Sequence, residues 1–367
     1  MQTSTTGSAN IQAQAGESFG ALFGDFSTAL EVDSIPGAIR HLRRTCQPVL
    51  LAILCLGPIP QVARSQTTAD TRAAILLTLP ASSRALALGE AWGAVADDES
   101  TLFYNPAQLA RVRALAVGGS LQNYIASTTL GAFAVAVPLR HGTIGVGLQL
   151  LDYGSADEIV PADGSNGQAG TPTGSTVTAQ DMAFTLGYGI AFGSRHELRV
   201  GAAVTYARQE VASYSGGAMA GDIGAAYSFA NGWDVSAALQ HLGSNLTLAS
   251  VSAPLPFTWR AAVAAPMVRA DAFTLRPMAE ARKVSGAEVT GVLGAEGTWR
   301  TGTSGTVLAA RAGYAFRGST DARAPFTVGA GITLGRLQVD YAYEGFDLIG
   351  GATNRVGVRF AALPRGP

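Results

Sequence analysis

The sequence predicts an all-β protein: a transmembrane antiparallel up-and-down β-barrel of about 14 strands, with an N-terminal hatch segment inside it. Charged residues make up 14% of the 367 residues, against about 25% in soluble domains, while 47% are hydrophobic and 45 are glycine. From about residue 112 onward, apolar residues alternate with small or polar ones. This composition excludes a disordered chain, and no second stretch approaches the roughly 20 apolar residues of a membrane helix. A net charge of −1 without a basic run argues against nucleic acid as a partner.

The N-terminal region predicts a targeting segment. The most apolar stretch, residues 48–57, follows a basic cluster at residues 40–44 and precedes a small-x-small site at Ala63–Ser65. This order is typical of a secretory signal peptide, which we expect over residues 37–65. A stretch of ten residues with Pro58 and Pro60 close behind is too short to span a membrane. The polar residues 1–36 are expected to be a mis-assigned start or a disordered extension.

The cysteines limit the chemistry that the processed chain can perform. Both of them, Cys46 and Cys55, fall inside the expected signal peptide. The chain from residue 66 onward would therefore have no disulfide, no thiolate metal site and no cysteine nucleophile.

The alternation after residue 112 predicts strands with one apolar face. In residues 336–346, for example, Leu337, Val339 and Tyr341 lie opposite Gln338 and Asp340. Fourteen such segments are predicted, over residues 112–121, 129–138, 143–152, 179–192, 196–208, 217–229, 232–242, 256–266, 270–283, 288–300, 306–316, 325–334, 336–346 and 352–361. Their lengths suit tilted membrane strands better than the five or six residues typical of soluble ones.

The connectors between these segments sort into two classes. Every second connector, beginning with the second, has one to five residues, including the turns at Asn231–Gly232 and Gly335. The others have four to 26 residues, and the longest runs from Tyr153 to Thr178. Outer-membrane barrels have short periplasmic turns and longer extracellular loops, so this pattern favours one over a soluble β-sandwich.

The two faces of the strands predict which side meets lipid. Large aliphatic and aromatic residues gather on one face, which suits outer-membrane lipid, while the other mixes glycine and alanine with charges. The predicted lumen-facing charges are Arg276, Glu280, Arg282, Glu296, Arg311, Asp340 and Arg359. We expect them to pair, because an unpaired charge in a confined lumen is costly. Three tryptophans near strand ends fit an aromatic girdle: Trp233, Trp259 and Trp299.

Residues 66–111 do not alternate and precede the first strand of the barrel at residues 112–367. Asn105 is a good N-cap, Pro106 suits a first helical turn and Arg111 suits a last turn, which predicts a short helix between them. A fourteen-strand barrel leaves a channel unless something fills it. The compact segment is therefore expected to be a hatch or plug, the alternative being a surface hairpin.

Several motifs resemble the PorV/PorQ family of outer-membrane proteins, a branch of the FadL-like fourteen-strand barrels. The opening matches are residues 83–89 (SRALALG), 94–98 (AVADD) and 104–107 (YNPA), and the closing ones are residues 310–314, 339–343 and 354–360. The resemblance implies that Asn105, Pro106 and Ala107 form the hatch motif. It also implies that Gly357, Val358, Arg359 and Phe360 form the C-terminal signal read by the barrel-assembly machinery. In the family pattern that phenylalanine comes last, whereas here residues 361–367 follow it.

The resemblance implies a protein of the bacterial outer membrane and leaves its function divided. PorV-like members act in type IX protein secretion and surface attachment, which is the leading hypothesis, with secretion-system proteins and exported cargo as partners. FadL-like members pass hydrophobic small molecules across the outer membrane, which is the alternative. A purely structural barrel comes third. The connector Tyr153–Thr178, rich in Gly, Ser, Thr and Pro, is expected to be either a contact for partners or a mobile solvated loop.

Signals for catalysis and cofactors are weak. The three histidines after residue 65, His141, His196 and His241, lack metal-ligand spacing, so no metal site is expected. His241 lies near Ser244 and Asn245, the residue types of a serine hydrolase, but no oxyanion hole is indicated, and loop residues are the better interpretation. We therefore expect no enzyme activity and no cofactor.

Two further motifs have structural explanations. The Gly-x-Gly repeats lead into strands and not helices, so they predict small inward-facing positions instead of a dinucleotide site. The adjacent acids Asp97 and Asp98 end an apolar stretch and are expected to be solvated.

Overall fold

The computed structural model describes residues 72–125, 128–161, 170–193, 196–302, 305–318, 321–347 and 351–362. The expected extension at residues 1–36 and the expected signal peptide at residues 37–65 lie outside the described residues.

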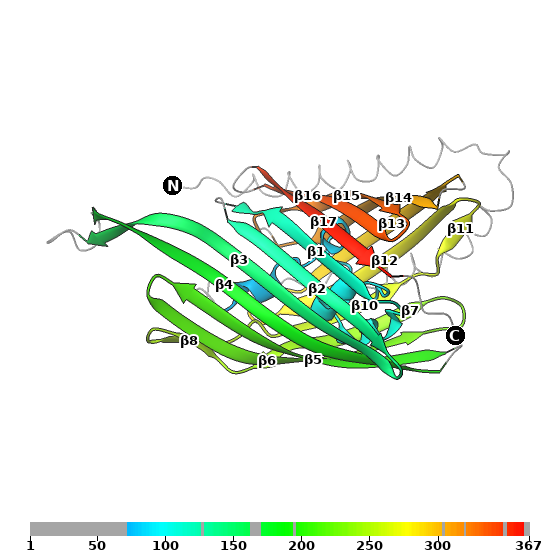
Figure 1. The fold of residues 1–367 in the computed structure, drawn as a ribbon, viewed down its shortest axis with the longest axis horizontal. Coiled ribbons are helices and arrows are strands. Elements are labelled where there is room, and N and C mark those ends of the chain that lie inside the picture. The colour runs from blue at the N-terminus through cyan, green and yellow to red at the C-terminus, as the bar shows by residue number, and fades with distance from the viewer. Residues whose placement is uncertain are drawn as a thin grey trace, which may run out of the picture. The chain divides into compact units, whose positions relative to one another are not determined.

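One antiparallel sheet closes on itself to form a barrel (Figure 1). It has 15 strands in the order β10-β7-β6-β5-β4-β3-β2-β1-β17-β16-β15-β14-β13-β12-β11, and a β10–β12 pairing closes the ring. Because β11 pairs with β12 only, the ring itself has fourteen strands, which confirms the predicted fold class.

Ring strands are generally 10 to 15 residues long, with a few shorter or longer exceptions. They are β1 (Ala116–Asn123), β2 (Thr129–Leu139), β3 (Gly142–Pro161), β4 (Gly170–Phe192), β5 (Glu197–Val211), β6 (Tyr214–Ser228), β7 (Asp234–Gly243), β10 (Thr258–Ala264), β12 (Phe273–Val284), β13 (Thr290–Thr301), β14 (Thr306–Phe316), β15 (Arg323–Leu334), β16 (Leu337–Phe346) and β17 (Ala352–Ala361). Three short strands, β8 (Leu246–Leu248), β9 (Val251–Ala253) and β11 (Val268–Ala270), lie in connectors. Within the described residues, four short helices precede the barrel: η1 (Ile75–Thr78), α3 (Ser83–Ala87), η2 (Glu99–Phe103) and η3 (Pro106–Arg111). None of the helices in the described part of the chain is long and apolar enough to cross a membrane.

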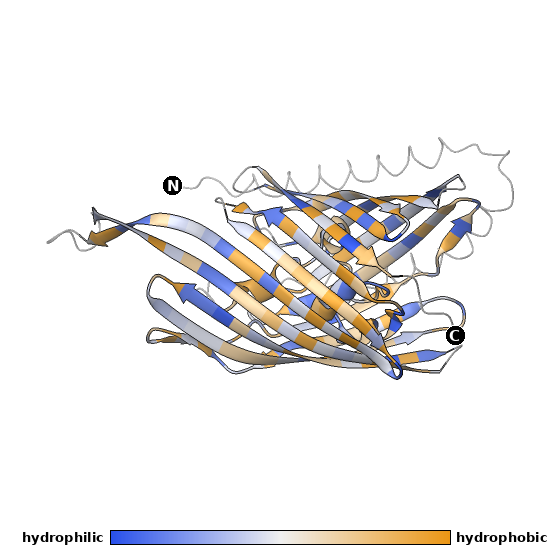
Figure 2. Cartoon of the chain, in the orientation of Figure 1, coloured by the Kyte–Doolittle hydropathy of each residue, from blue (hydrophilic) through white to orange (hydrophobic). Residues whose placement is uncertain are grey.

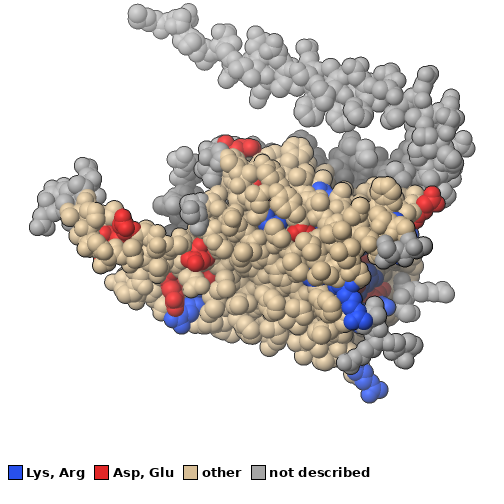
Figure 3. All heavy atoms as spheres, turned by 45° about the horizontal axis from the view of Figure 1, so that its top comes forward, with Lys and Arg blue, Asp and Glu red and all other residues tan. Residues whose placement is uncertain are grey.

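Hydrophobic and hydrophilic residues alternate along the strands of the barrel wall (Figure 2), and exposure shows that the large apolar ones face outward. On β4, Phe184, Leu186 and Tyr188 point outward and are exposed, while Ala183 and Thr185 between them are buried. In Figure 3 the middle of the visible face is mostly uncharged, and charged side chains gather toward its ends. An apolar outer band around a closed antiparallel sheet is the surface of an outer-membrane barrel, since only lipid can cover it without cost.

The two ends of the barrel differ in their connectors. The first residue of β1 pairs with the last residue of β17, so the chain enters and leaves the barrel on the same side of the membrane. The two-residue turns 140–141 and 335–336 lie on this side as well. Gly232 and Gly335 have positive φ angles of 90° and 61° in turns at this end, where glycine avoids a steric cost. We name this the periplasmic end and the other the extracellular end, following the rule for such barrels.

The expectation of a loop at Tyr153–Thr178 is wrong. Strands β3 and β4 continue through most of it, and their pairing extends to Pro161↔Gly170. The sequence misled because glycine and proline suggest a loop, whereas the β-branched residues among them favour extended pairing. Beyond Asp152 and Ala179 the two strands pair only with each other in the described part of the chain, forming a ribbon that projects past the barrel (Figure 1).

Candidate functional site

Residues 72–112, which we call the inner segment, pack against the inward face of the strands. Nearly all of them are buried, and the side chains of Leu86, Trp92, Leu102 and Leu109 are at most 1% exposed. The inner segment thus packs inside the barrel wall, and that it is a hatch or plug stays a prediction.

The hatch motif Asn105, Pro106 and Ala107 begins helix η3. The Asn105 side chain accepts a hydrogen bond from the Ala107 amide at 3.1 Å, and Pro106 occupies the first turn, as the sequence predicted. The wall opposite carries glycine: a Cβ at Gly201 would collide with Pro106, and one at Gly224 with Asn105. The motif therefore fits against a part of the wall that has no side chains.

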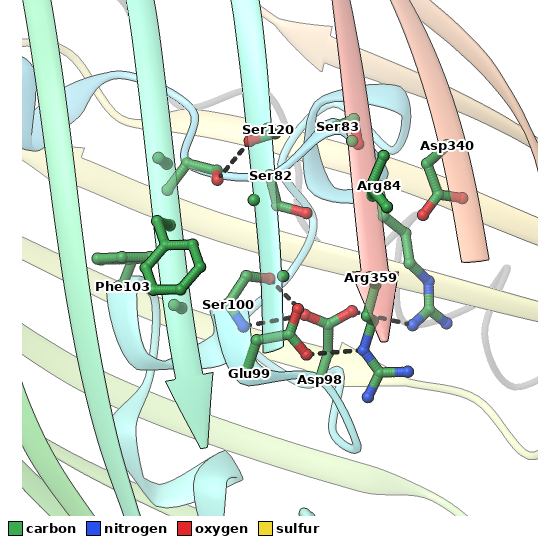
Figure 4. A pocket seen from close by; sticks show the side chains of 18 residues that line it. Ser82, Ser83, Arg84, Asp98, Glu99, Ser100, Phe103, Ser120, Asp340 and Arg359 are labelled. Atoms are coloured by element: carbon green, nitrogen blue, oxygen red, sulfur yellow. Dashed lines mark hydrogen bonds and ion pairs between the residues drawn. The ribbon is translucent and has the colours of Figure 1, made fainter. Parts of the chain in front are cut away.

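Ion pairs join the inner segment to the charged side of the wall, and Figure 4 shows the one between Glu99 and Arg359. Arg84 on α3 donates to both carboxylate oxygens of Glu296 on β13, at 2.7 and 2.6 Å. Arg311 on β14 also donates to Glu296, at 2.6 Å, and to Asp340 on β16, at 2.7 Å. Bidentate arginine–carboxylate pairs of this kind are among the stronger and more directional polar contacts.

A second group of contacts holds the middle of the inner segment against β12. Arg282 lies 2.6 Å from Glu90 of the inner segment. Glu280 accepts hydrogen bonds from the backbone amides of Trp92 and Gly93, at 3.1 and 2.8 Å. The carboxylate of Glu90 on the inner segment and that of Glu280 on β12 thus both have partners across the same interface.

A third group lies near the periplasmic end. Arg359 on β17 donates to Glu99 at 2.7 Å, and Arg111 donates to Glu197 on β5 at 2.7 Å. Asp98 is only 3% exposed, caps η2 through the Ser100 amide and lies 3.4 Å from Arg84. The expectation that Asp98 is solvated is therefore wrong, because its carboxylate has partners on both sides; the neighbouring Asp97 is exposed.

The structure places all seven predicted lumen charges on the inward face, each with a charged partner. Six of them are described above, and the seventh, Arg276, lies 2.6 Å from Asp234 on β7. Sequence analysis did not identify most of the partners, because Arg84, Glu90 and Glu99 belong to a segment without alternation. The available signal was the presence of these charges within an otherwise small and apolar stretch.

The opposite side of the lumen is mostly apolar at its extracellular half, apart from the buried Asp181 on β4, which the sequence did not predict. Inward-facing residues of β2 to β6 form one cluster with the start of the inner segment and the β8–β9 hairpin: Ala73, Ala74, Leu76, Leu77, Leu130, Leu151, Ala183, Ala207, Ala218, Ala220, Leu246 and Leu255. Leu130 and Leu151 are 0% and 2% exposed. The lumen therefore has a charged side and an apolar side at its extracellular half.

Two hollows open at the extracellular end. An apolar hollow of about 280 Å³ lies between the β5–β6 hairpin and the β8–β9 hairpin, lined by Val211, Tyr214, Leu246, Leu248 and Ala73 of the inner segment among others. A larger one of about 610 Å³ is more polar and is lined by residues 72–79 of the inner segment and by the loops after β1, β12 and β14. The apolar hollow adjoins the apolar side of the lumen through Ala73 and Leu246.

The residue types of a hydrolase are not assembled into a catalytic arrangement. The His241 ring is buried and bonds to the carbonyl of Pro256 at 3.0 Å, and its backbone amide donates to Asp222 at 2.6 Å. Ser244 is exposed, and its backbone amide bonds to Met219. Within the described residues, no group of three or more His, Cys, Asp or Glu could hold a metal ion.

The predicted assembly signal, Gly357, Val358, Arg359 and Phe360, lies near the periplasmic end of β17. Val358 and Phe360 point outward and are 49% and 43% exposed, while Arg359 points inward. Recognition by the assembly machinery stays a prediction.

Comparisons with known proteins concern the fold. No family model matches the sequence, and no curated protein matches it. Among solved structures, the toluene transporter TbuX of Ralstonia pickettii is 11% identical, with 76% of this chain and 98% of that chain covered and a TM-score of 0.49. The toluene transporter TodX of P. putida is 10% identical, with 77% and 99% covered and a TM-score of 0.49. A FadL homologue of Pseudomonas aeruginosa is 10% identical, with 77% and 97% covered and a TM-score of 0.46.

Proposed function

We propose that the protein is a non-enzymatic outer-membrane channel that carries small hydrophobic molecules inward across the outer membrane. The observation that supports this is the apolar side of the lumen, which continues into the apolar hollow at the extracellular end. This is the alternative that the sequence left open, and it takes precedence here over protein export.

The side chains that a solute would contact determine whether the channel favours polar or apolar molecules. A water-filled channel for polar solutes is lined by polar side chains. Here the open surface of the apolar hollow is lined by Val211, Leu248 and Val251, and an apolar solute beside them would gain about 25 cal/mol for each Å² removed from water. The hollow of about 280 Å³ is near the lower limit of small-molecule sites, which suits one small molecule.

Leu248→Gln is expected to weaken uptake of a small aromatic hydrocarbon. Leu248 lines the apolar hollow, and an amide there would lose about 1.5 kcal/mol of apolar contact, roughly a tenfold rise in the half-saturating concentration. The measurement is saturation of radiolabelled hydrocarbon uptake by proteoliposomes that contain the purified barrel.

The matched control is Leu242→Gln, an exposed leucine that does not line the hollow. It should leave the half-saturating concentration unchanged. Equal uptake by protein-free liposomes, or a Leu248→Gln curve that superimposes on the wild type, would contradict the proposal.

Protein export or surface attachment is the second candidate, and the β3–β4 ribbon favours it. Both of its edges lack a neighbouring strand in the described part of the chain, and an open edge can accept an added strand from a partner. A two-stranded ribbon is marginally stable alone, so a partner would stabilise it.

Removal of ribbon residues 155–176 is expected to separate the two candidates. If the protein serves export, affinity purification after crosslinking in its own outer membrane should recover a large translocon or secreted proteins sharing a C-terminal domain. Recovery should then fall at least tenfold without the ribbon, while the barrel itself still assembles. Recovery of the barrel alone from both strains would leave transport as the function.

A further inference from the structure

The periplasmic end of the barrel carries a hollow that the transport proposal does not use. It has a volume of about 490 Å³ and lies where β2, β3 and β4 meet the end of helix η3. Its lining combines three basic side chains, Arg113, Arg140 and His141, with apolar ones such as Leu139 and Phe192. Leu139 and Phe192 are 51% and 52% exposed on the outer side of the wall.

The arginines of this hollow are available for a ligand. Within the described residues, neither Arg113 nor Arg140 makes an ion pair or side-chain hydrogen bond, although most arginines of the barrel interior do. No acidic residue lines the hollow. The turn that carries Arg140 is held in place, because the Tyr188 hydroxyl donates to the His141 carbonyl at 2.7 Å.

Exposed arginines outnumber exposed acids on the rest of the periplasmic rim, where Asp271 is one of the acids. Three further arginines without a described side-chain partner lie at this end: Arg269, Arg300 and Arg336. The extracellular end instead carries exposed acids, including Asp157 on the β3–β4 ribbon and Glu288 in the loop after β12. The charge difference between the two ends matches a membrane leaflet of anionic phospholipid at the periplasmic end.

We propose that this hollow binds an anionic phospholipid of the inner leaflet, with its phosphate between Arg113 and Arg140. The guanidinium groups suit a phosphate because they can donate two parallel hydrogen bonds to its oxygens. An acyl chain would lie along Leu139 and Phe192, which face lipid at the same level. Basic pockets at a membrane surface recognise lipid head groups by this combination of charge and apolar contact.

The site is independent of the transported solute and would fix the barrel's depth in the membrane. Short turns leave the periplasmic end close to the membrane surface, where a lipid head group can reach it. A specific lipid there would also contact Arg113, the residue that directly follows the inner segment.

The test is native mass spectrometry of the folded, detergent-solubilised barrel with equimolar phosphatidylglycerol and phosphatidylethanolamine. Wild-type protein is expected to retain phosphatidylglycerol preferentially. In Arg113→Gln/Arg140→Gln the binding constant should fall about 25-fold, from a factor of about five for each cation near an anionic lipid. Both arginines are exposed, so the variant should fold, which heat-modifiable migration in gels verifies.

The matched control is Lys283→Gln, which removes an exposed cation at the extracellular end. It should bind phosphatidylglycerol as the wild type does. Equal retention of the two lipids by the wild type would overturn the proposal, as would a double variant whose phosphatidylglycerol binding matches that of Lys283→Gln. Complete displacement by inorganic phosphate at an equal concentration would also overturn it, since a site for the anion alone needs no acyl chain.

Discussion

Deletion of residues 72–112 is expected to turn the barrel from a closed state into an open pore. A ring of fourteen strands is wider than the eight-stranded barrels whose interiors side chains alone can fill. In this protein the inner segment supplies the missing volume, since Trp92, Leu102 and Leu109 are fully buried within the ring. The expected result in planar bilayers is a change from a silent baseline to stable single-channel steps in the deletion variant.

The deletion should be tolerated during folding for an electrostatic reason. Glu280, Glu296 and Arg359 lose partners from the inner segment, but water that enters the lumen hydrates them. The strand pairing of the ring does not depend on the inner segment. The control is removal of ribbon residues 155–176, which leaves the lumen filled and should stay silent. A deletion variant that folds and remains silent would mean that the inner segment does not plug the barrel.

The barrel was predictable because its signals are local and repeated. Alternation such as that of Leu337, Val339 and Tyr341 defines a face within a few residues, and lipid on that face follows from their size. The contrast between short and long connectors distinguished the periplasmic end of the barrel from the extracellular end, and it required no knowledge of which strands pair. Each of these signals is read from one segment at a time.

The contents of the lumen were harder to predict because they depend on long-range contacts. Arg84 and Glu296 are separated by 212 residues, and nothing near either one indicates the other. The apolar side was missed for a different reason: Leu151 on the inner face directly follows Leu150 on the outer face, so alternation there is weak. The ribbon was missed because its glycine and proline content is typical of loops, although pairing with β3 or β4 satisfies its backbone.

Glu296→Ala is expected to cause a much larger loss of stability than a similar change on the surface. Arg84 would keep only Asp98, at 3.4 Å, while Arg311 would still have Asp340 at 2.7 Å. Removing one member of a buried ion pair costs about 3–5 kcal/mol, because the partner's charge remains buried. The loss should appear as a lower urea midpoint for unfolding of the barrel from lipid vesicles.

The control for this change is Glu210→Ala, which breaks the exposed pair between Glu210 and Arg208. An exposed pair contributes about 0–1 kcal/mol, so its midpoint should hardly move. Glu296→Ala/Arg84→Ala should recover part of the loss, since the double variant no longer buries an unmatched guanidinium. Equal midpoints for Glu296→Ala and Glu210→Ala would show that water reaches Glu296 freely, and that the contact between Arg84 and Glu296 does not hold the inner segment in place.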